Sequence, residues 1–122
     1  MKVAFIGLGV MGYPMAGFLS QGGHDVTVFN RTKSKAEAWR GEYGGSVAAT
    51  PRQAAAGAEI VFCCVGNDND VRQVILGDDG VLAGTACGAV IVDHTTASAL
   101  IACEIYEQAR EKGVDFLDAP LS

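Results

Sequence analysis

The stretch Met1–Gly12, MKVAFIGLGVMG, decides the fold of this chain. Its residues 2–6 are a short apolar run of the kind that forms a strand buried on both faces. The run continues directly into Gly7–Gly12, a G-x-G-x-x-G motif, and an apolar stretch with few helix breakers follows at 15–19. Strand, glycine loop and helix in this order are the context in which the motif predicts a dinucleotide site.

Each glycine of the motif has a separate predicted task. Gly7 makes the tight turn, Gly9 lets the backbone approach a pyrophosphate, and Gly12 lets the helix pack close to the strand. The helix N-terminus adds unpaired N–H groups and a partial positive charge, which favour phosphate. Because the chain contains 16 glycines, the motif alone is a weak signal. A glycine turn without a ligand is the alternative that the rest of the chain has to exclude.

The composition bounds the class of protein. The length of 122 residues suits one domain, and a hydrophobic share of 49% is enough for a core. The net charge of −5 and the lack of a Lys/Arg cluster with interleaved aromatics argue against nucleic-acid binding. No apolar run approaches the roughly 20 residues of a membrane span, and the N-terminus does not resemble a signal peptide. We therefore expect a cytoplasmic protein with no membrane partner.

The four cysteines are Cys63, Cys64, Cys87 and Cys103. They form no C-x-x-C pair, so the sequence predicts neither a zinc site nor a redox motif. The adjacent Cys63 and Cys64 would point to opposite faces of a strand. We expect buried, reduced thiols and no metal ion.

Strand and helix patterns alternate along the chain. The expected strands are 2–6, 25–29, 46–48, 59–65, 89–92 and 114–118. The expected helices run from the glycines to about 21, then over 34–43, 51–56, 70–76 and 97–112. This alternation predicts an α/β fold, a Rossmann-type doubly wound parallel sheet of strand order 3-2-1-4-5-6. Since the chain ends directly after a strand, we expect residues 1–122 to be one domain of a longer protein.

The end of the second strand bears on the choice of dinucleotide. An NAD site usually places Asp or Glu there, about 20 residues beyond the glycines, to bind the ribose 2′-hydroxyl. Here Asn30 occupies that place and Arg31 follows it. A carboxylate would repel a 2′-phosphate, whereas Asn beside Arg can receive one. The sequence therefore favours NADP over NAD, with a solvated arginine at a helix start as the alternative.

The other strand ends give weaker signals. The expected fourth strand ends at Val65, and Gly66 after it would allow a cofactor to approach closely. We expect both residues to contact the cofactor. Asn67 and Asp68 are better explained as helix caps than as ligands. Asp118 ends the last strand, where anchoring of the loop is a better explanation than catalysis.

The loop after the fifth strand contains a histidine and two threonines. Thr95 and Thr96 can each cap the following helix or bind the nicotinamide ribose, and both roles stay open. His94 lacks the carboxylate and nucleophile that an acid–base role would need, so we do not expect it to be catalytic. His24 lies in a turn at the opposite edge of the sheet, where we expect a structural role.

Four blocks resemble the cofactor domain of the β-hydroxyacid dehydrogenase family, which includes 3-hydroxyisobutyrate dehydrogenases. They are Phe5–Ala16, Asn30–Thr32, Asp93–Thr96 and Phe116–Ser122. The resemblance implies a parent enzyme in which NADP(H) exchanges hydride with a small hydroxyacid or aldehyde acid. It implies a pyrophosphate cradle of Gly7, Leu8, Gly9, Met11 and Gly12, and a site for the adenosine ribose phosphate at Asn30, Arg31 and Thr32. It also implies a nicotinamide contact at Thr96 and a substrate carboxylate contact at Ser122.

The family's catalytic lysine lies in a later segment, at the start of a helical substrate and dimerisation domain. None of Lys2, Lys33, Lys35 and Lys112 matches it, so we expect no catalytic residue within 1–122. The resemblance further implies a homo-oligomer for the full-length protein. We expect the 122 residues by themselves to bind cofactor weakly and not to turn over.

Two other functions remain open at this stage. One is a non-catalytic nucleotide-sensing module that keeps the glycine loop. The other is the cofactor domain of a different reductase, such as an imine reductase. The ending Ala119–Ser122 favours the hydroxyacid group.

Overall fold

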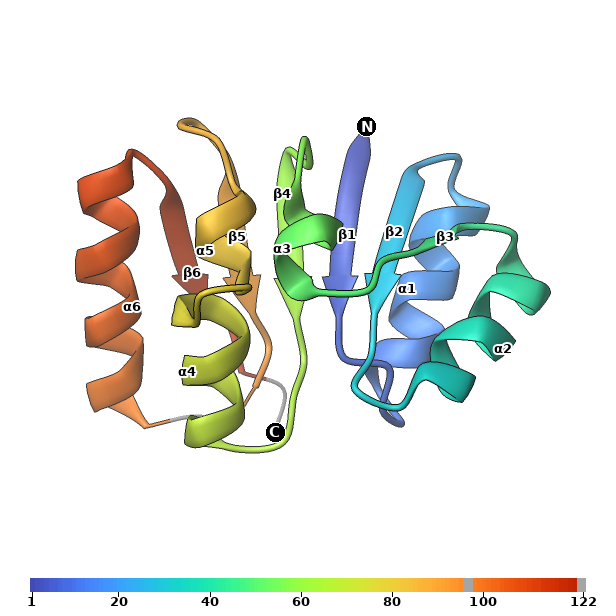
Figure 1. Ribbon diagram of the computed structural model, residues 1–122, viewed down its shortest axis with the longest axis horizontal. Helices are drawn as coiled ribbons and strands as arrows, with labels where there is room; N and C mark the ends of the chain where they lie inside the picture. The colour runs from blue at the N-terminus through green and yellow to red at the C-terminus, as the bar shows by residue number, and fades with distance from the viewer. Residues whose placement is uncertain (96–97, 121–122) are drawn as a thin grey trace.

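A computed structural model describes residues 1–95 and 98–120. The strands are β1 (Lys2–Ile6), β2 (Asp25–Phe29), β3 (Ser46–Val47), β4 (Ile60–Cys63), β5 (Val90–Asp93) and β6 (Asp115–Asp118). The helices are α1 (Gly12–Gln21), α2 (Lys33–Tyr43), α3 (Pro51–Ala55), α4 (Asp68–Leu76), α5 (Val81–Gly84) and α6 (Ala99–Lys112). The strands form one parallel sheet of order β3-β2-β1-β4-β5-β6, which confirms the predicted doubly wound topology (Figure 1).

The strand order places a crevice next to β1. The chain starts in the middle of the sheet and moves outward through β2 and β3 (Figure 1). It then crosses back to β4, on the other side of β1, and moves outward in the opposite direction to β6. In such sheets, ligands bind where the strand order reverses, beyond the carboxyl ends of the strands. That point lies between β1 and β4.

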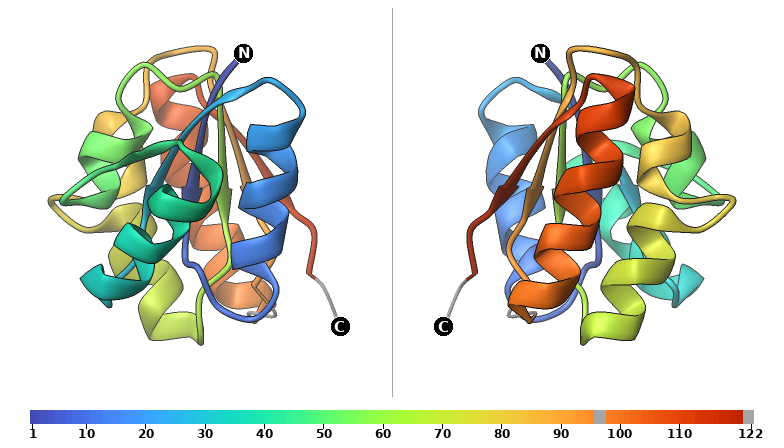
Figure 2. Two further views of the ribbon diagram at one scale, coloured as in Figure 1. Left: turned by 90° about the vertical axis from the view of Figure 1, so that its right-hand side faces the viewer. Right: turned by 90° about the vertical axis from the view of Figure 1, so that its left-hand side faces the viewer.

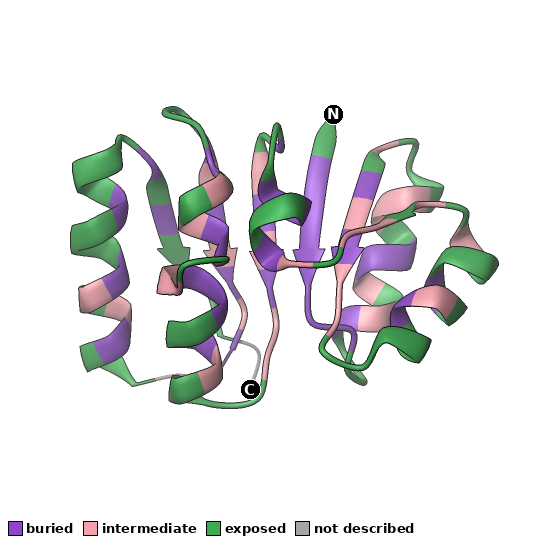
Figure 3. Cartoon of the chain, viewed as in Figure 1, coloured by how far each residue is buried: buried purple, intermediate pink, exposed green. Residues whose placement is uncertain are grey.

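The sheet separates two hydrophobic cores, and helices lie on both sides of it (Figure 2). Successive residues of β1 face opposite cores: Phe5 belongs to the core under α1 and α2, and Ile6 to the core under α3–α6. All of β1 except Lys2 is buried, as a strand covered on both faces requires (Figure 3). Trp39 of α2 is fully buried in the first core.

Helix ends differ from the predicted ones by one or two residues. The Asn67 side chain accepts a hydrogen bond from the Asp70 N–H at 3.0 Å, so α4 begins directly after this cap at Asp68. Ser98 caps α6 in the same way, through the Ile101 N–H at 3.3 Å. The short helix α5 lies where we expected no helix, because its four residues are too few to produce a helical period.

The expectation of four buried thiols is wrong for two cysteines. All four lie in the described ranges and are unpaired, but only Cys63 is buried, Cys64 is half-buried, and Cys87 and Cys103 are exposed. Cys87 lies in the loop before β5, and Cys103 lies on α6 beside inward-facing residues, where sequence alone did not separate the two faces. Burial raises the pKa of the Cys63 thiol well above its ordinary value, so this group stays neutral.

Candidate functional site

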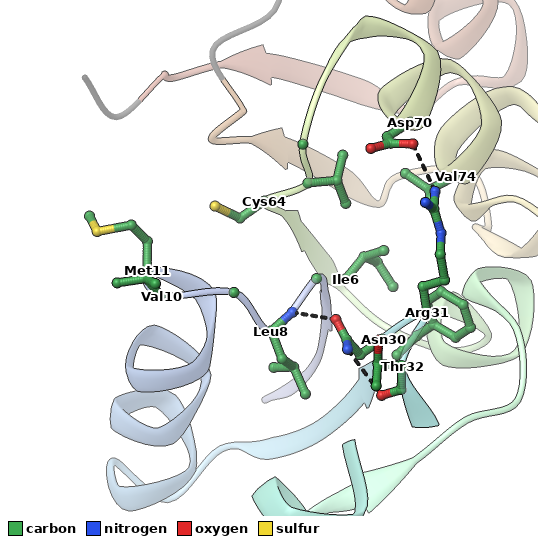
Figure 4. Close-up of a pocket in the computed structure, with 15 residues that line it drawn as sticks. Ile6, Leu8, Val10, Met11, Asn30, Arg31, Thr32, Cys64, Asp70 and Val74 are labelled. Atoms are coloured by element: carbon green, nitrogen blue, oxygen red, sulfur yellow. Dashed lines mark hydrogen bonds and ion pairs between the residues drawn. The ribbon is translucent and has the colours of Figure 1, made fainter. Parts of the chain in front are cut away.

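A pocket of about 400 Å³ lies at the point where the strand order reverses (Figure 4). The glycine loop, the end of β2 and the segment between β4 and α4 form its walls. Its lining residues are Ile6, Gly7, Leu8, Gly9, Val10, Met11, Phe29, Asn30, Arg31, Thr32, Cys64, Val65, Gly66, Asp70 and Val74. The structure thus brings together the residues predicted for the adenosine ribose and those predicted for the pyrophosphate, except Gly12, which is not among the lining residues.

The three glycines of the loop differ in the space around them. Gly7 has a φ of +98°, and a Cβ there would lie 2.1 Å from the carbonyl oxygen of Cys64. A Cβ on Gly12 would lie 2.1 Å from the Gly7 carbonyl oxygen, so both positions need glycine for the fold itself. A Cβ on Gly9 would meet nothing within 4 Å. Packing therefore leaves Gly9 free, and open space for a ligand remains beside its backbone.

Asn30 connects two walls of the pocket. Its Oδ1 accepts a hydrogen bond from the Leu8 N–H at 2.9 Å, and its Nδ2 donates to the Thr32 carbonyl oxygen at 3.0 Å (Figure 4). The Leu8 N–H is therefore already bonded within the protein. Met11, also expected in the cradle, has a half-exposed side chain at the pocket mouth.

Arg31 extends from the end of β2 toward α4. Its Nη2 lies 2.7 Å from Oδ1 of Asp70, a carboxylate in the first turn of α4 (Figure 4). The Arg31 side chain is 73% exposed and that of Asp70 only 23%. The guanidinium is thus accessible from the pocket while it is paired. Sequence reasoning missed Asp70, because no local pattern links residues that lie 39 positions apart.

A second connection joins the ends of β4 and β5. The Thr95 hydroxyl oxygen accepts a hydrogen bond from the Val65 N–H at 3.0 Å. The Thr95 N–H in turn donates to Oδ1 of Asp93, which is only 1% exposed. Burial raises the pKa of the Asp93 carboxyl, and the Thr95 hydrogen bonds partly offset this. The roles considered for Thr95 were helix cap and ribose contact, but in the structure it anchors the segment after β4.

The remaining predicted residues have mixed outcomes. Asn67 caps α4 as expected, and Asp68 binds the Ser98 N–H at 2.9 Å, which joins α4 to the start of α6. Hydrogen bonding to Ser98, through its side chain first and its N–H second, lowers the pKa of the Asp68 carboxyl. Thr96 and Ser122 lie outside the described residues, so their assigned contacts stay predictions.

His94 makes contacts that suit a structural residue. Its Nδ1 lies 2.8 Å from the Ala119 carbonyl oxygen, which can only accept, so Nδ1 carries the proton. Its ring stacks on Phe62 at a centroid distance of 6.0 Å.

Within residues 1–95 and 98–120, no three His, Cys, Asp or Glu side chains gather in a way that could hold a metal ion. None of the helices in these ranges has the length and apolar character needed to cross a membrane.

The family model of the NAD binding domain of 6-phosphogluconate dehydrogenase matches residues 2–122. An uncharacterised oxidoreductase from Shewanella frigidimarina is 60% identical over 121 residues, which are 99% of this chain and 42% of that protein. The chain thus spans about two fifths of the length of this relative.

Solved structures give the same picture. The 3-hydroxyisobutyrate dehydrogenase of Mycobacterium tuberculosis, determined with L-serine, superposes with a TM-score of 0.89 at 31% identity, covering 99% of this chain and 40% of that one. An imine reductase from Myxococcus stipitatus in complex with NADP+ superposes with a TM-score of 0.83 at 30% identity, covering 95% and 39%.

Proposed function

This chain belongs to the family of the NAD binding domain of 6-phosphogluconate dehydrogenase, and we propose that it is the NADP-binding domain of an oxidoreductase. The cofactor class of the family is a nicotinamide dinucleotide, whose nicotinamide accepts or donates the hydride. We propose a small 3-hydroxyacid or aldehyde acid as the other partner of that exchange. One observation carries the proposal: the space beside Gly9 is open to the pocket, whereas Gly7 and Gly12 have no room for a side chain because backbone atoms lie too close.

The pocket residues fit a dinucleotide. The backbone beside Gly9 has room for a pyrophosphate, and the N-terminus of the ten-residue helix α1 lies at the same loop. No acidic side chain occurs in Gly7–Gly12 to repel the phosphates. Asn30 holds the Leu8 backbone in place, and Val65 is held by Thr95. These residues bind and orient the cofactor in the proposed enzyme.

The end of β2 supports NADP over NAD. Asn30 replaces the carboxylate that would bind a ribose 2′-hydroxyl, and the Arg31 guanidinium is 73% exposed. A guanidinium forms paired, charge-assisted hydrogen bonds to phosphate oxygens. Thr32, on the same rim of the pocket, is the third residue that we assign to the 2′-phosphate.

We assign the rest of the reaction to residues that only the resemblance indicates. Thr96 would contact the nicotinamide side, Ser122 the substrate carboxylate, and a lysine beyond Ser122 the substrate oxygen. The α1 side of the sheet offers a surface for a further domain. Phe62, Val92 and Leu117 are in register across β4, β5 and β6 there, and Leu117 is 57% exposed. We also propose a homo-oligomeric full-length protein in the cytoplasm, where unpaired thiols are stable.

Calorimetric titration of the full-length protein with NADP+ and NAD+ tests the cofactor proposal. We expect NADP+ to bind about tenfold or more tightly, and Arg31→Ala to lose that advantage while NAD+ changes less than about twofold. Arg40→Ala removes the same charge from α2 outside the pocket and serves as the control. Equal affinity for the two cofactors in the wild type would refute the NADP preference, and no binding of either would refute the cofactor site.

The proposed reaction is tested by assaying the full-length protein with NADP(H) and a panel of substrates. We expect hydride transfer with 3-hydroxyisobutyrate or with small aldehyde acids. Turnover of cyclic imines alone would favour the imine-reductase function. The similarity to a solved imine reductase makes this function the second candidate. Cofactor binding with no turnover of any substrate would favour the sensing module.

A further inference from the structure

The ion pair between Arg31 and Asp70 crosses the proposed cofactor pocket. The two side chains come from opposite sides of the point where the strand order reverses, Arg31 after β2 and Asp70 in the first turn of α4 (Figure 4). Both residues line the pocket. The group that would bind a 2′-phosphate is thus already occupied by an anion of the protein itself.

The Asp70 side chain has less freedom to move than the Arg31 side chain, because it is short and only 23% exposed. The Asp70 N–H is bonded to the Asn67 cap at 3.0 Å. Oδ1 faces Arg31, while Oδ2 lies 2.8 Å from the position that a Cβ of Gly66 would take. The absence of a side chain at Gly66 therefore makes room for this carboxylate in the pocket wall. Arg31, by contrast, reaches Asp70 with a long and largely exposed side chain, which can turn away when another anion arrives.

We propose that Asp70 sets how strongly this site prefers NADP over NAD, by competing with the 2′-phosphate for Arg31. This inference rests on the proposed function. A 2′-phosphate that binds Arg31 has to displace the Asp70 carboxylate, so NADP binding includes the loss of the ion pair. NAD carries no 2′-phosphate and leaves the pair intact. Asp70 therefore weakens the binding of NADP but not of NAD, and reduces the difference between the affinities for the two cofactors.

The size of the effect follows from the exposure of the pair. A single ion pair at the surface contributes little, so its loss lowers NADP affinity by a factor of a few, roughly 3 to 10. Arg31 still gains more from a phosphate dianion than from one carboxylate. The site accordingly keeps a preference for NADP and also accepts NAD.

Asp70→Asn in the full-length protein is the direct test, because it removes the charge and keeps the shape. We expect NADP+ to bind about 3- to 10-fold more tightly and NAD+ to change less than about twofold. The affinity for the fragment 2′,5′-ADP should rise as the affinity for NADP+ does, and the affinity for 5′-AMP should not change. In the Arg31→Ala background, Asp70→Asn should change NADP+ affinity less than about twofold. Asp25→Asn alters net charge equally at the opposite edge of the sheet and should change neither affinity.

Four outcomes would overturn the inference. An unchanged ratio of the two affinities in Asp70→Asn, with a wild type that binds both cofactors, refutes the competition and leaves the proposed function standing. A loss of NAD+ affinity with unchanged NADP+ affinity means that Asp70 binds the ribose instead. Persistence of the full gain in the Arg31→Ala background means that Asp70 does not act through Arg31. A wild type that binds neither cofactor refutes the proposed function together with this inference.

Discussion

Oδ1 of Asn30 accepts a hydrogen bond from the Leu8 N–H at 2.9 Å, which fixes the glycine loop to the end of β2. Nδ2 of the same side chain donates to the Thr32 carbonyl oxygen at 3.0 Å. One amide thus sets the spacing between the residues assigned to the pyrophosphate and those assigned to the 2′-phosphate. Asn30 was predicted as a ligand for the ribose phosphate, and its bonds give it a structural role beside that one.

Asn30→Ala should therefore weaken the binding of both cofactors and lower the unfolding free energy of the protein. The Leu8 N–H, in a residue with no exposed surface, loses its acceptor, which costs about 1–3 kcal/mol of unfolding free energy. Asn30→Asp is the matched variant, since it keeps an acceptor for Leu8 but adds a charge that repels a 2′-phosphate. Urea unfolding and calorimetric titration of both variants measure the two effects. If Asn30→Ala unfolds and binds like the wild type, the hydrogen bond does not hold the loop.

Gly9→Ala should lower cofactor affinity without lowering stability, whereas Gly12→Ala should lower the stability of the fold. A Cβ at Gly9 has no neighbour within 4 Å, so Gly9→Ala should keep its unfolding free energy or gain up to about 1 kcal/mol. Its methyl group enters the space assigned to the pyrophosphate, and we expect cofactor affinity to fall about tenfold or more. A Cβ at Gly12 lies 2.1 Å from the Gly7 carbonyl oxygen and should cost about 1–3 kcal/mol of stability. A stable Gly9→Ala protein with unchanged affinity would contradict the assignment of the loop.

The buried Asp93 should make stability depend on pH. Burial raises the pKa of its carboxyl in the folded state above the ordinary value of 3.8, so the folded protein holds this proton more tightly than the unfolded chain. Its contribution to stability is then fully present below pH 3.8 and is lost as the pH rises through the raised pKa. The unfolding free energy of the wild type minus that of Asp93→Asn should fall over this range. A difference that stays constant over this range would contradict the raised pKa of Asp93.

Thr95→Val should loosen the segment after β4. The variant keeps the shape of the side chain but removes the hydroxyl that accepts the Val65 N–H, which costs about 1–2 kcal/mol. Faster hydrogen exchange at the Val65 amide is the expected signature, and Thr95→Ser should restore protection. Equal exchange rates in all three proteins would show that this hydrogen bond does not anchor the segment.

Much of the fold could be predicted because its signals are local. The alternation of apolar runs with helical patterns identified the parallel sheet and the start of the helix predicted at 51, where the Thr50 hydroxyl accepts a hydrogen bond from the Gln53 N–H. Helix ends were less predictable, since Thr95, Thr96 and Ser98 are all possible caps within four residues. The exposed thiol of Cys103 was missed because a residue's helix face depends on what packs against it.

The sequence by itself determined the glycine loop, the strand order and the residues at the strand ends. These depend on local properties: the period of the apolar residues, the backbone freedom of Gly7, and the handedness of the crossovers. Only the tertiary structure decided that Asn30 binds Leu8, that Thr95 binds Val65, and that Arg31 pairs with Asp70. Each of these contacts joins segments that follow different strands, and the relative positions of these segments follow from how the helices pack on the sheet.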